Sequence, residues 1–234
     1  MAATGSTSPV NCLLDALPAI DRRRVLARFD NVELVFADVL YNVGETLDHV
    51  YFPLGCFISL IVPIDDSSLE VGLVGSEGMF GIPLALGVSV SPVHAVVQGA
   101  GSALRMGAAS FRRELRRSLA LQRTIGRYAF VRASQLAQMA GCTRFHVIEA
   151  RLARWLLMTQ DRAHADSFHI TQNFLAAMLG VRRVGVTKAA SSLQSRNLIR
   201  YSRGQMTVLD RPGLEAASCG CYDKDRKSYA RILG

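Results

Sequence analysis

Apolar residues recur with helical spacing in two neighbouring segments of the last third of the chain. In the first segment Leu175, Met178 and Leu179 share one face, and Thr171 before them is a favourable N-cap. Gly180 then provides a turn, because a residue without a Cβ atom adopts a positive φ at little cost. The second segment has apolar positions at i, i+4 and i+7, namely Val186, Ala190 and Leu193. This pattern predicts a helix-turn-helix.

Two β-rich runs follow these helices, at residues 198–201 and 206–209. The polar residues 202–205 between them have the composition of a turn. The runs therefore predict a hairpin, which would form a wing beside the second helix.

The first half of the chain has a different pattern. Short β-rich runs between residues 32 and 106 alternate with Gly, Asp, Asn and Pro turns, after a loose tail at residues 1–9 and a short amphipathic helix at 12–29. Strands at this spacing are typical of a β-sandwich or a rolled-up barrel. We therefore expect an α+β protein with an N-terminal β domain and a helical C-terminal domain.

A long helical pattern at residues 110–140 joins the two halves. It should end at residues 141–143. A further helix at 145–162 should open the C-terminal domain, and a connector at 164–167 should lead from it into the helix-turn-helix. So long a helix has too little of its own domain to cover an apolar stripe, so the stripe predicts a homodimer interface. Packing of the stripe on the β domain is the alternative. The predicted interface residues are Leu121, Ile125, Tyr128, Ala129, Arg132, Leu136 and Met139.

Charge separates the two halves of the chain. Residues 1–110 hold 5 basic and 11 acidic side chains, a net −6, whereas residues 111–234 hold 22 basic and 8 acidic ones, a net +14. Between residues 168 and 211 the chain has seven Arg or Lys residues and one acid, Asp210. A polyanion is therefore the expected partner of the C-terminal domain. A helical pair with a merely solvated basic face is the alternative.

Double-stranded DNA is the polyanion that a helix-turn-helix fits. Cationic and hydroxyl side chains on the exposed side of the second helix suit the base edges and phosphates of a major groove. The predicted DNA-binding residues are Thr171, Gln172, Arg182, Arg183, Val184, Thr187, Lys188, Ser191 and Arg203.

Cysteine usage and hydropathy indicate the compartment. Five scattered cysteines fit a reducing cytoplasm better than a disulfide framework. The first nine residues lack the basic start and apolar run of a secretory signal, and no stretch of about 18 apolar residues could span a membrane. We therefore expect a cytoplasmic protein with no membrane partner.

The sequence shows no strong catalytic or metal-binding motif. Cys219-Gly-Cys221 is too tight for the C-x₂-C zinc pattern and lacks a companion pair, which favours an ordinary tail over a redox pair or a weak metal site. Cys12 alone near the N-terminus excludes a four-thiolate iron–sulfur cluster there. His94 lies in an apolar run and is expected in the core rather than as a haem ligand. With no nucleophile elbow, P-loop or paired carboxylates, we expect no enzyme, no cofactor and no metal site.

The order of these elements and motifs resembles the Crp/Fnr family of bacterial transcription regulators. The specific part runs from Ile170 and Thr171 through Gly180 to Lys188 and continues at residues 197–199. Weaker matches in the first domain are Gly44, Glu45, Tyr51, Gly78 and Gly81.

The resemblance implies a domain order and a set of partners. A cyclic-nucleotide-binding-like β-roll sensor domain would occupy residues 1–110, a dimerisation helix 111–141, a winged helix-turn-helix 145–220 and a C-terminal tail 221–234. The resemblance also implies a homodimer that binds a two-fold symmetric promoter site, with one recognition helix in each half-site. RNA polymerase is a further implied partner.

Two departures from the family pattern change what we expect. The best-known members have an Arg-Glu pair and a second Arg where this chain has Arg183, Val184 and Lys188, so a different target sequence is expected. Nucleotide-binding members hold the ribose and the phosphate with a Glu and an Arg, whereas residues 79–104 contain no Asp, Glu, Lys or Arg. Leu136-Ala137 also replace the polar pair that meets the base.

A buried phosphate without a guanidinium would be unpaired, so we expect no control by cyclic nucleotide, and the effector stays unknown. Two alternatives remain open. One is a small-molecule-binding signalling module whose winged domain mediates protein contacts, and the other is a divergent cyclic-nucleotide receptor that uses other residues.

Overall fold

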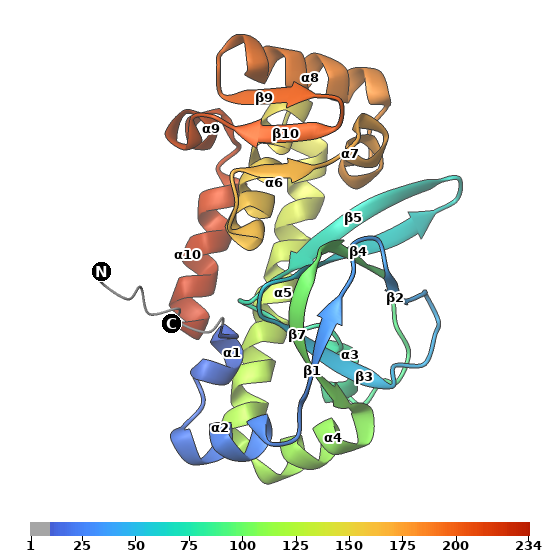
Figure 1. Cartoon of the computed structure of the whole chain (residues 1–234), viewed down its shortest axis with the longest axis vertical. Coiled ribbons are helices and arrows are strands. Elements are labelled where there is room, and N and C mark those ends of the chain that lie inside the picture. Colours follow the sequence, from blue (N-terminus) through green and yellow to red (C-terminus); the bar gives the residue numbers. More distant parts are fainter. Residues whose placement is uncertain (1–9) are drawn as a thin grey trace, which may run out of the picture.

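The computed structural model describes residues 10–234, and Figure 1 shows a β domain, a long helix beside it and a smaller domain at one end. The tail expected at residues 1–9 lies outside the described residues. The described chain opens with two short helices, α1 (Cys12–Asp15) and α2 (Ala19–Leu26), where the sequence predicts one. Pro18 separates them, because its ring disfavours a helical conformation in the residue before it.

The β domain consists of two antiparallel sheets with the strand orders β1-β7-β3 and β2-β6-β4-β5. A single-turn helix, α3 (Ile82–Ala85), lies between β5 and β6. The strands are β1 (Asp30–Leu34), β2 (Val39–Tyr41), β3 (His49–Pro53), β4 (Phe57–Ile64), β5 (Ser67–Val74), β6 (His94–Gly99) and β7 (Gly101–Gly107).

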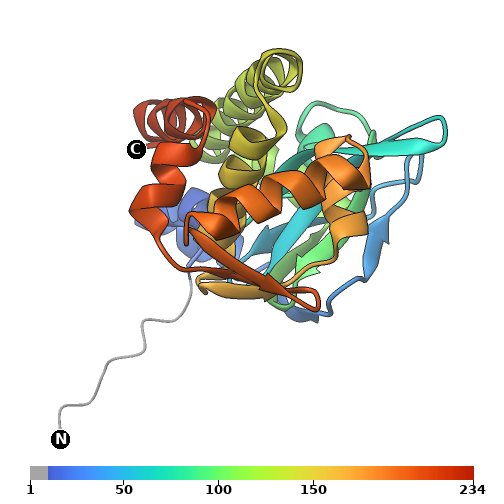
Figure 2. The same ribbon diagram turned by 90° about the horizontal axis from the view of Figure 1, so that it is seen from above.

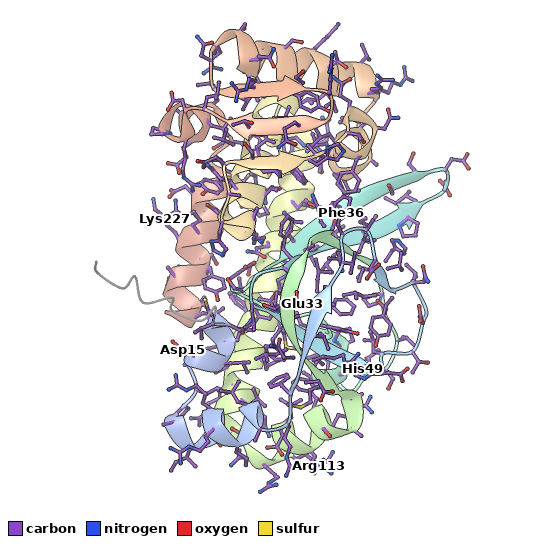
Figure 3. All side chains as sticks on the ribbon, viewed as in Figure 1. Asp15, Glu33, Phe36, His49, Arg113 and Lys227 are labelled. Atoms are coloured by element: carbon purple, nitrogen blue, oxygen red, sulfur yellow. The ribbon has the colours of Figure 1, made fainter. Side chains whose placement is uncertain are left out.

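Side chains from both sheets fill the space between them (Figure 3). Val50 of β3 lies opposite Met106 of β7, and Ile58 of β4 lies opposite Val97 of β6; all four are fully buried. Such cross-strand apolar pairs fix the register, because a slip by one residue would turn them toward solvent. The predicted β domain of the Crp/Fnr type is confirmed.

The helical stretch predicted from residue 110 is two helices, α4 (Ala108–Arg117) and α5 (Leu119–Phe145). They separate at Ser118, whose backbone is extended and whose hydroxyl accepts a hydrogen bond from the Leu121 amide (3.1 Å). Ser118 is thus the N-cap of α5.

The helix break predicted at residues 141–143 is wrong, because α5 continues through it to Phe145. One glycine inside a helix costs only about 1 kcal/mol, and Cys142 is buried against the C-terminal segment. The break comes at His146 and Val147, whose backbones are extended.

The apolar face of α5 is covered differently from the prediction. Leu121, Ile125 and Tyr128 are at most 2% exposed and belong to the core of the β domain, so they cannot meet a partner chain. Arg132 is also buried, and it donates to the Leu73 carbonyl (3.3 Å) and the Gln135 side chain (2.7 Å). The alternative interpretation, packing on the β domain, therefore holds for these residues. Leu136 is 44% exposed, and Ala129 and Met139 are half-buried.

The C-terminal domain surrounds α6 (Ile148–Ala163), whose Leu152, Leu156 and Leu157 are fully buried. Its small sheet has the order β8-β10-β9, so the predicted hairpin is present and a third strand is added. This strand, β8, begins in the segment predicted as a connector and pairs with β10 (Met206 opposite Phe168). The remaining elements are β8 (Ser167–His169), α7 (Gln172–Leu179), α8 (Arg183–Ser195), β9 (Ile199–Ser202), β10 (Gln205–Val208) and α9 (Arg211–Ala217).

Residues 221–234, expected as a tail, form the helix α10 (Cys221–Leu233), which runs beside α5 (Figure 1). Its Asp225 pairs with Arg154 of α6 (2.6 Å), and its Tyr229 donates to the Glu77 carbonyl (2.6 Å). The C-terminal helix therefore binds both domains together. Among the described residues 10–234, no helix combines the length and apolarity needed to cross a bilayer.

Candidate nucleic-acid interface

The pair α7 and α8 has the predicted turn and caps. The Thr171 hydroxyl accepts from the Phe174 amide (3.1 Å), and Gly180 ends α7 at a φ of 60°. Arg182 occupies the N-cap of α8 without a side-chain capping bond, so its guanidinium extends into solvent. Val186 and Leu193 turn inward and are fully buried. In the view from above, α8 crosses the side of the molecule nearest the viewer (Figure 2).

Six of the nine residues predicted to contact DNA lie on α8 or at its N-cap, and the others lie at the start of α7 and in the wing. Gln172 of α7 accepts from the Thr187 hydroxyl (2.9 Å) and from Arg183 Nε (3.4 Å), so it positions both side chains. The exposed predicted residues are Thr171, Arg182, Arg183, Val184, Thr187, Lys188, Ser191 and Arg203, and Gln172 is half-buried among them.

Two hydrogen bonds of Tyr201 fix the wing, one to α8 and one to the segment before α7. The Tyr201 amide donates to the Gln194 side chain (2.8 Å), and its hydroxyl donates to the Ile170 carbonyl (2.9 Å). Arg203 and Gly204 form the tip, with φ angles of 51° and 81°. The hairpin turn thus presents the Arg203 side chain beside the recognition helix.

A hollow of about 400 Å³ lies between the wing and the first turns of α7 and α8. Two guanidinium side chains, Arg183 and Arg203, are among the residues around it. The residues that line it are His169, Thr171, Gln172, Asn173, Arg183, Tyr201, Ser202, Arg203 and Gly204. Of these, His169, Asn173 and Ser202 are polar groups that the sequence prediction missed. They stand at element ends, where helical periodicity gives no signal.

The positive charge of this domain is unevenly neutralised. Arg211 pairs with Asp161 (2.7 Å) and Glu215 (3.1 Å), and Arg196 pairs with Glu149 (3.0 Å). Of the seven cations between residues 168 and 211, the five others form no ion pair within residues 10–234; they are Arg182, Arg183, Lys188, Arg200 and Arg203. The surface formed by α8 and the wing therefore lacks internal counterions, as a polyanion-binding surface does.

The interior of the β domain bears on ligand binding. Tyr41 stacks on Phe80 with ring centroids 5.7 Å apart, and Tyr51 contacts both rings at 6.5 Å. All three residues are at most 8% exposed. Burial raises the pKa of Tyr41, whose hydroxyl accepts from the Asp48 and His49 amides. Aromatic rings thus occupy the region beside Gly81.

Two polar contacts, the first buried and the second half-buried, join the β domain to the C-terminal domain. Glu70 of β5 accepts from Ser59 (2.6 Å) and from Trp155 Nε1 of α6 (2.9 Å), and burial raises the pKa of this carboxyl to about 7. Glu77 accepts from Arg162 of α6 (2.7 Å). These contacts set the position of the domain that carries α8.

Metal-ligating side chains gather at the joint of α5 and α6, where Cys142 and His146 meet Cys219 and Cys221. The sequence prediction treated the C-terminal cysteines as unaccompanied.

Comparison with known proteins agrees with this geometry. Residues 150–217 match the model of the Crp-like helix-turn-helix domain. No curated protein sequence matches the chain significantly.

Several solved structures share the fold. The c-di-GMP-responsive global regulator CLP of Xanthomonas campestris aligns with a TM-score of 0.67 at 17% identity, covering 82% of this chain and 99% of that one. A CRP/FNR-family transcriptional regulator of Thermus thermophilus aligns with a TM-score of 0.67 at 20% identity, covering 81% of this chain and 98% of that one. FixK2 of Bradyrhizobium japonicum aligns with a TM-score of 0.66 at 13% identity, covering 82% of this chain and 98% of that one. Residues 150–217 are therefore a Crp-like helix-turn-helix domain, in a chain with the fold of the Crp/Fnr transcription regulators.

Proposed function

We propose that the chain is a sequence-specific DNA-binding transcription regulator that acts as a homodimer on a two-fold symmetric promoter site. The observation that carries the proposal is the group of five cations without internal counterions on α8 and the wing. DNA phosphates supply the missing negative charge, and release of their counterions supplies much of the affinity. A regulator of this kind works with RNA polymerase in the cytoplasm, where promoters are read.

The contacts divide between base edges and backbone. Arg183 and Lys188 are both exposed on α8 and would enter the major groove, whereas Arg182 and Arg203 flank it and would bind phosphates. Val184, which is 60% exposed, would meet a base edge through apolar contact, for instance with a thymine methyl group. No carboxylate is there to accept from a cytosine amine.

The dimer interface that we propose is the outer face of α5. Phe130 is 58% exposed, and Ala133, Ala137 and Ala140 follow it at spacings of three and four residues. Small side chains at this spacing let two helices approach closely along their length. Leu136 flanks the same face. This stripe replaces the buried residues Leu121, Ile125 and Tyr128 of the sequence prediction.

Control by cyclic AMP or cyclic GMP is not part of the proposal. Residues 79–104 offer no charged side chain to a phosphate, and the stacked rings of Tyr41, Tyr51 and Phe80 fill the adjoining interior. A nucleotide there would displace aromatic packing and gain no fixed cation.

Selection of bound sites from random duplexes tests the proposal. We expect recovered sites to be two-fold symmetric, with half-sites centred about 34–36 Å apart, and binding to weaken as salt rises. Lys224→Ala removes an exposed cation of α10, outside the surface of α8 and the wing, and this control variant should bind the selected duplexes with unchanged affinity. Failure to enrich any duplex, at low salt as well, would favour the alternative of a module for protein contacts.

A further inference from the structure

Three cysteines and a histidine that are far apart in the sequence meet at the joint between α5 and α6. Cys142 and His146 are one helical turn apart at the end of α5, and Cys219 and Cys221 flank the start of α10. Their ligand atoms all lie within 4.8 Å of one another. The three cysteines are buried, free of disulfides, and pack mainly against each other and Ala150.

The spacing of these atoms is that of a tetrahedral metal site. Around a zinc ion with bonds of about 2.3 Å to sulfur and about 2.0–2.1 Å to nitrogen, two sulfurs lie about 3.8 Å apart, and a sulfur and a nitrogen lie about 3.5 Å apart. The Sγ atoms of Cys142 and Cys219 are 3.6 Å apart, and Cys221 Sγ lies 3.5 Å from His146 Nδ1.

Donor groups of two neighbouring side chains point at the cysteine sulfurs. Arg154 directs Nη1 at Cys142 Sγ (3.6 Å), and Gln138 donates to Cys221 Sγ (3.0 Å). Such outer contacts orient metal ligands and stabilise their charge.

We propose that Cys142, His146, Cys219 and Cys221 bind one zinc ion. Three thiolates and a neutral imidazole complete a tetrahedral set, which leaves no open position and defines a structural site. Zinc displaces the thiol protons when it binds, so affinity should fall at low pH.

The position of the ligands gives the site a purpose. Cys142 and His146 precede the Crp-like domain, which spans residues 150–217, and Cys219 and Cys221 follow it. A bound ion would therefore join the two ends of the DNA-binding domain to the end of α5. Because α5 also carries the proposed dimer face, zinc would fix the orientation of α8 relative to that face.

Metal content of the full chain, purified under reducing conditions, tests the inference. We expect about one zinc per chain by inductively coupled plasma mass spectrometry. Replacement with cobalt(II) should give intense visible bands of tetrahedral coordination and thiolate charge-transfer bands in the near ultraviolet. This spectrum needs no variant, so it stays decisive if a substitution impairs folding.

Substitutions identify the ligands. Cys142→Ser and Cys221→Ser should lower zinc content at least several-fold, whereas Cys12→Ser, at a cysteine outside the cluster, should keep the wild-type value. His146→Ala should retain metal more weakly and shift the cobalt bands.

Three results would overturn the zinc assignment. The first is that the protein takes up neither zinc nor cobalt, and the second is that the cysteine substitutions leave its metal content unchanged. The third is that it contains iron and acid-labile sulfide in place of zinc. A Cys142–Cys219 disulfide in metal-free protein that rejects zinc after reduction would indicate a redox pair instead. DNA binding is measured separately, so a failed metal test leaves the proposed function standing.

Discussion

Glu70 should make the stability of this protein depend on pH near neutrality. Its carboxyl is fully buried between the two domains, and burial raises its pKa from an ordinary 4.5 to about 7. The folded state therefore holds this proton more strongly than the unfolded state does. The contribution of Glu70 to the free energy of unfolding is therefore largest below about pH 4.5, and it is lost as the pH rises to about 7.

The size of this effect follows from the pKa difference. At about 1.4 kcal/mol for each pH unit, the Glu70 contribution lost between pH 4.5 and pH 7 is on the order of 3 kcal/mol. Glu70→Gln removes the titration but can still accept from Trp155 and bond to Ser59, whose hydroxyl donates or accepts. The variant should therefore be more stable than wild type at pH 8, and the difference should shrink or reverse at pH 5.

Urea unfolding followed by tryptophan fluorescence measures the difference, because Trp155 is the single tryptophan and donates to Glu70 itself. Glu33→Gln, at an exposed position on β1 labelled in Figure 3, is the control and should keep the wild-type pH dependence. Parallel stability curves for wild type and Glu70→Gln from pH 5 to pH 8 would refute the reasoning.

Three further predictions concern DNA, assembly and ligand. Arg183→Ala should weaken specific binding by roughly 1–3 kcal/mol and relax one base position, whereas Arg203→Ala should weaken all duplexes alike and flatten the salt dependence; unchanged site preference in Arg183→Ala, measured by selection from random duplexes, would contradict the assignment of α8. Phe130→Glu and Leu136→Glu place charge on the outer face of α5 and should sediment as monomers, while Ile20→Glu, at an exposed apolar residue of α2, should not. Dimers in all three variants would exclude that face. Calorimetry should detect no binding of cyclic AMP or cyclic GMP with a dissociation constant below about 10 μM, which corresponds to a binding free energy of about 7 kcal/mol. Tighter binding would show that the β domain supplies other phosphate contacts.

The helix-turn-helix could be predicted because its determinants are local. Thr171 caps α7 and Gly180 ends it, and each helix has one apolar stripe, so the elements and their exposed faces follow from neighbouring residues. The sequence could not predict that His169 and Asn173 line the hollow, because the wing and the start of α7 meet only through tertiary packing.

The face of α5 shows a different limit of sequence reasoning. A stripe such as Ile125 and Tyr128 shows that a surface is buried, but its spacing does not say which chain covers it. The small residues Ala133, Ala137 and Ala140 on the exposed side give a weak hydropathy signal, although they suit close helix packing. The joint at His146 was missed for a related reason, since Gly141 is a stronger local breaker than any residue at the actual break.

The cysteine cluster also could not be predicted from local sequence, and it affects how the DNA-binding domain is attached to the rest of the chain. Cys142 and Cys219 are 77 positions apart, so each half of the site looks incomplete in the sequence. The domain between them contacts the β domain through Glu70, Glu77 and apolar residues such as Ile61, and it contacts the end of α5 through this cluster. The Glu70 contact is sensitive to protons and the proposed zinc site to metal, in a way that apolar packing is not. In a dimer the two copies of α8 must lie one turn of duplex apart, so a small rotation at this joint would be enough to lose the second half-site.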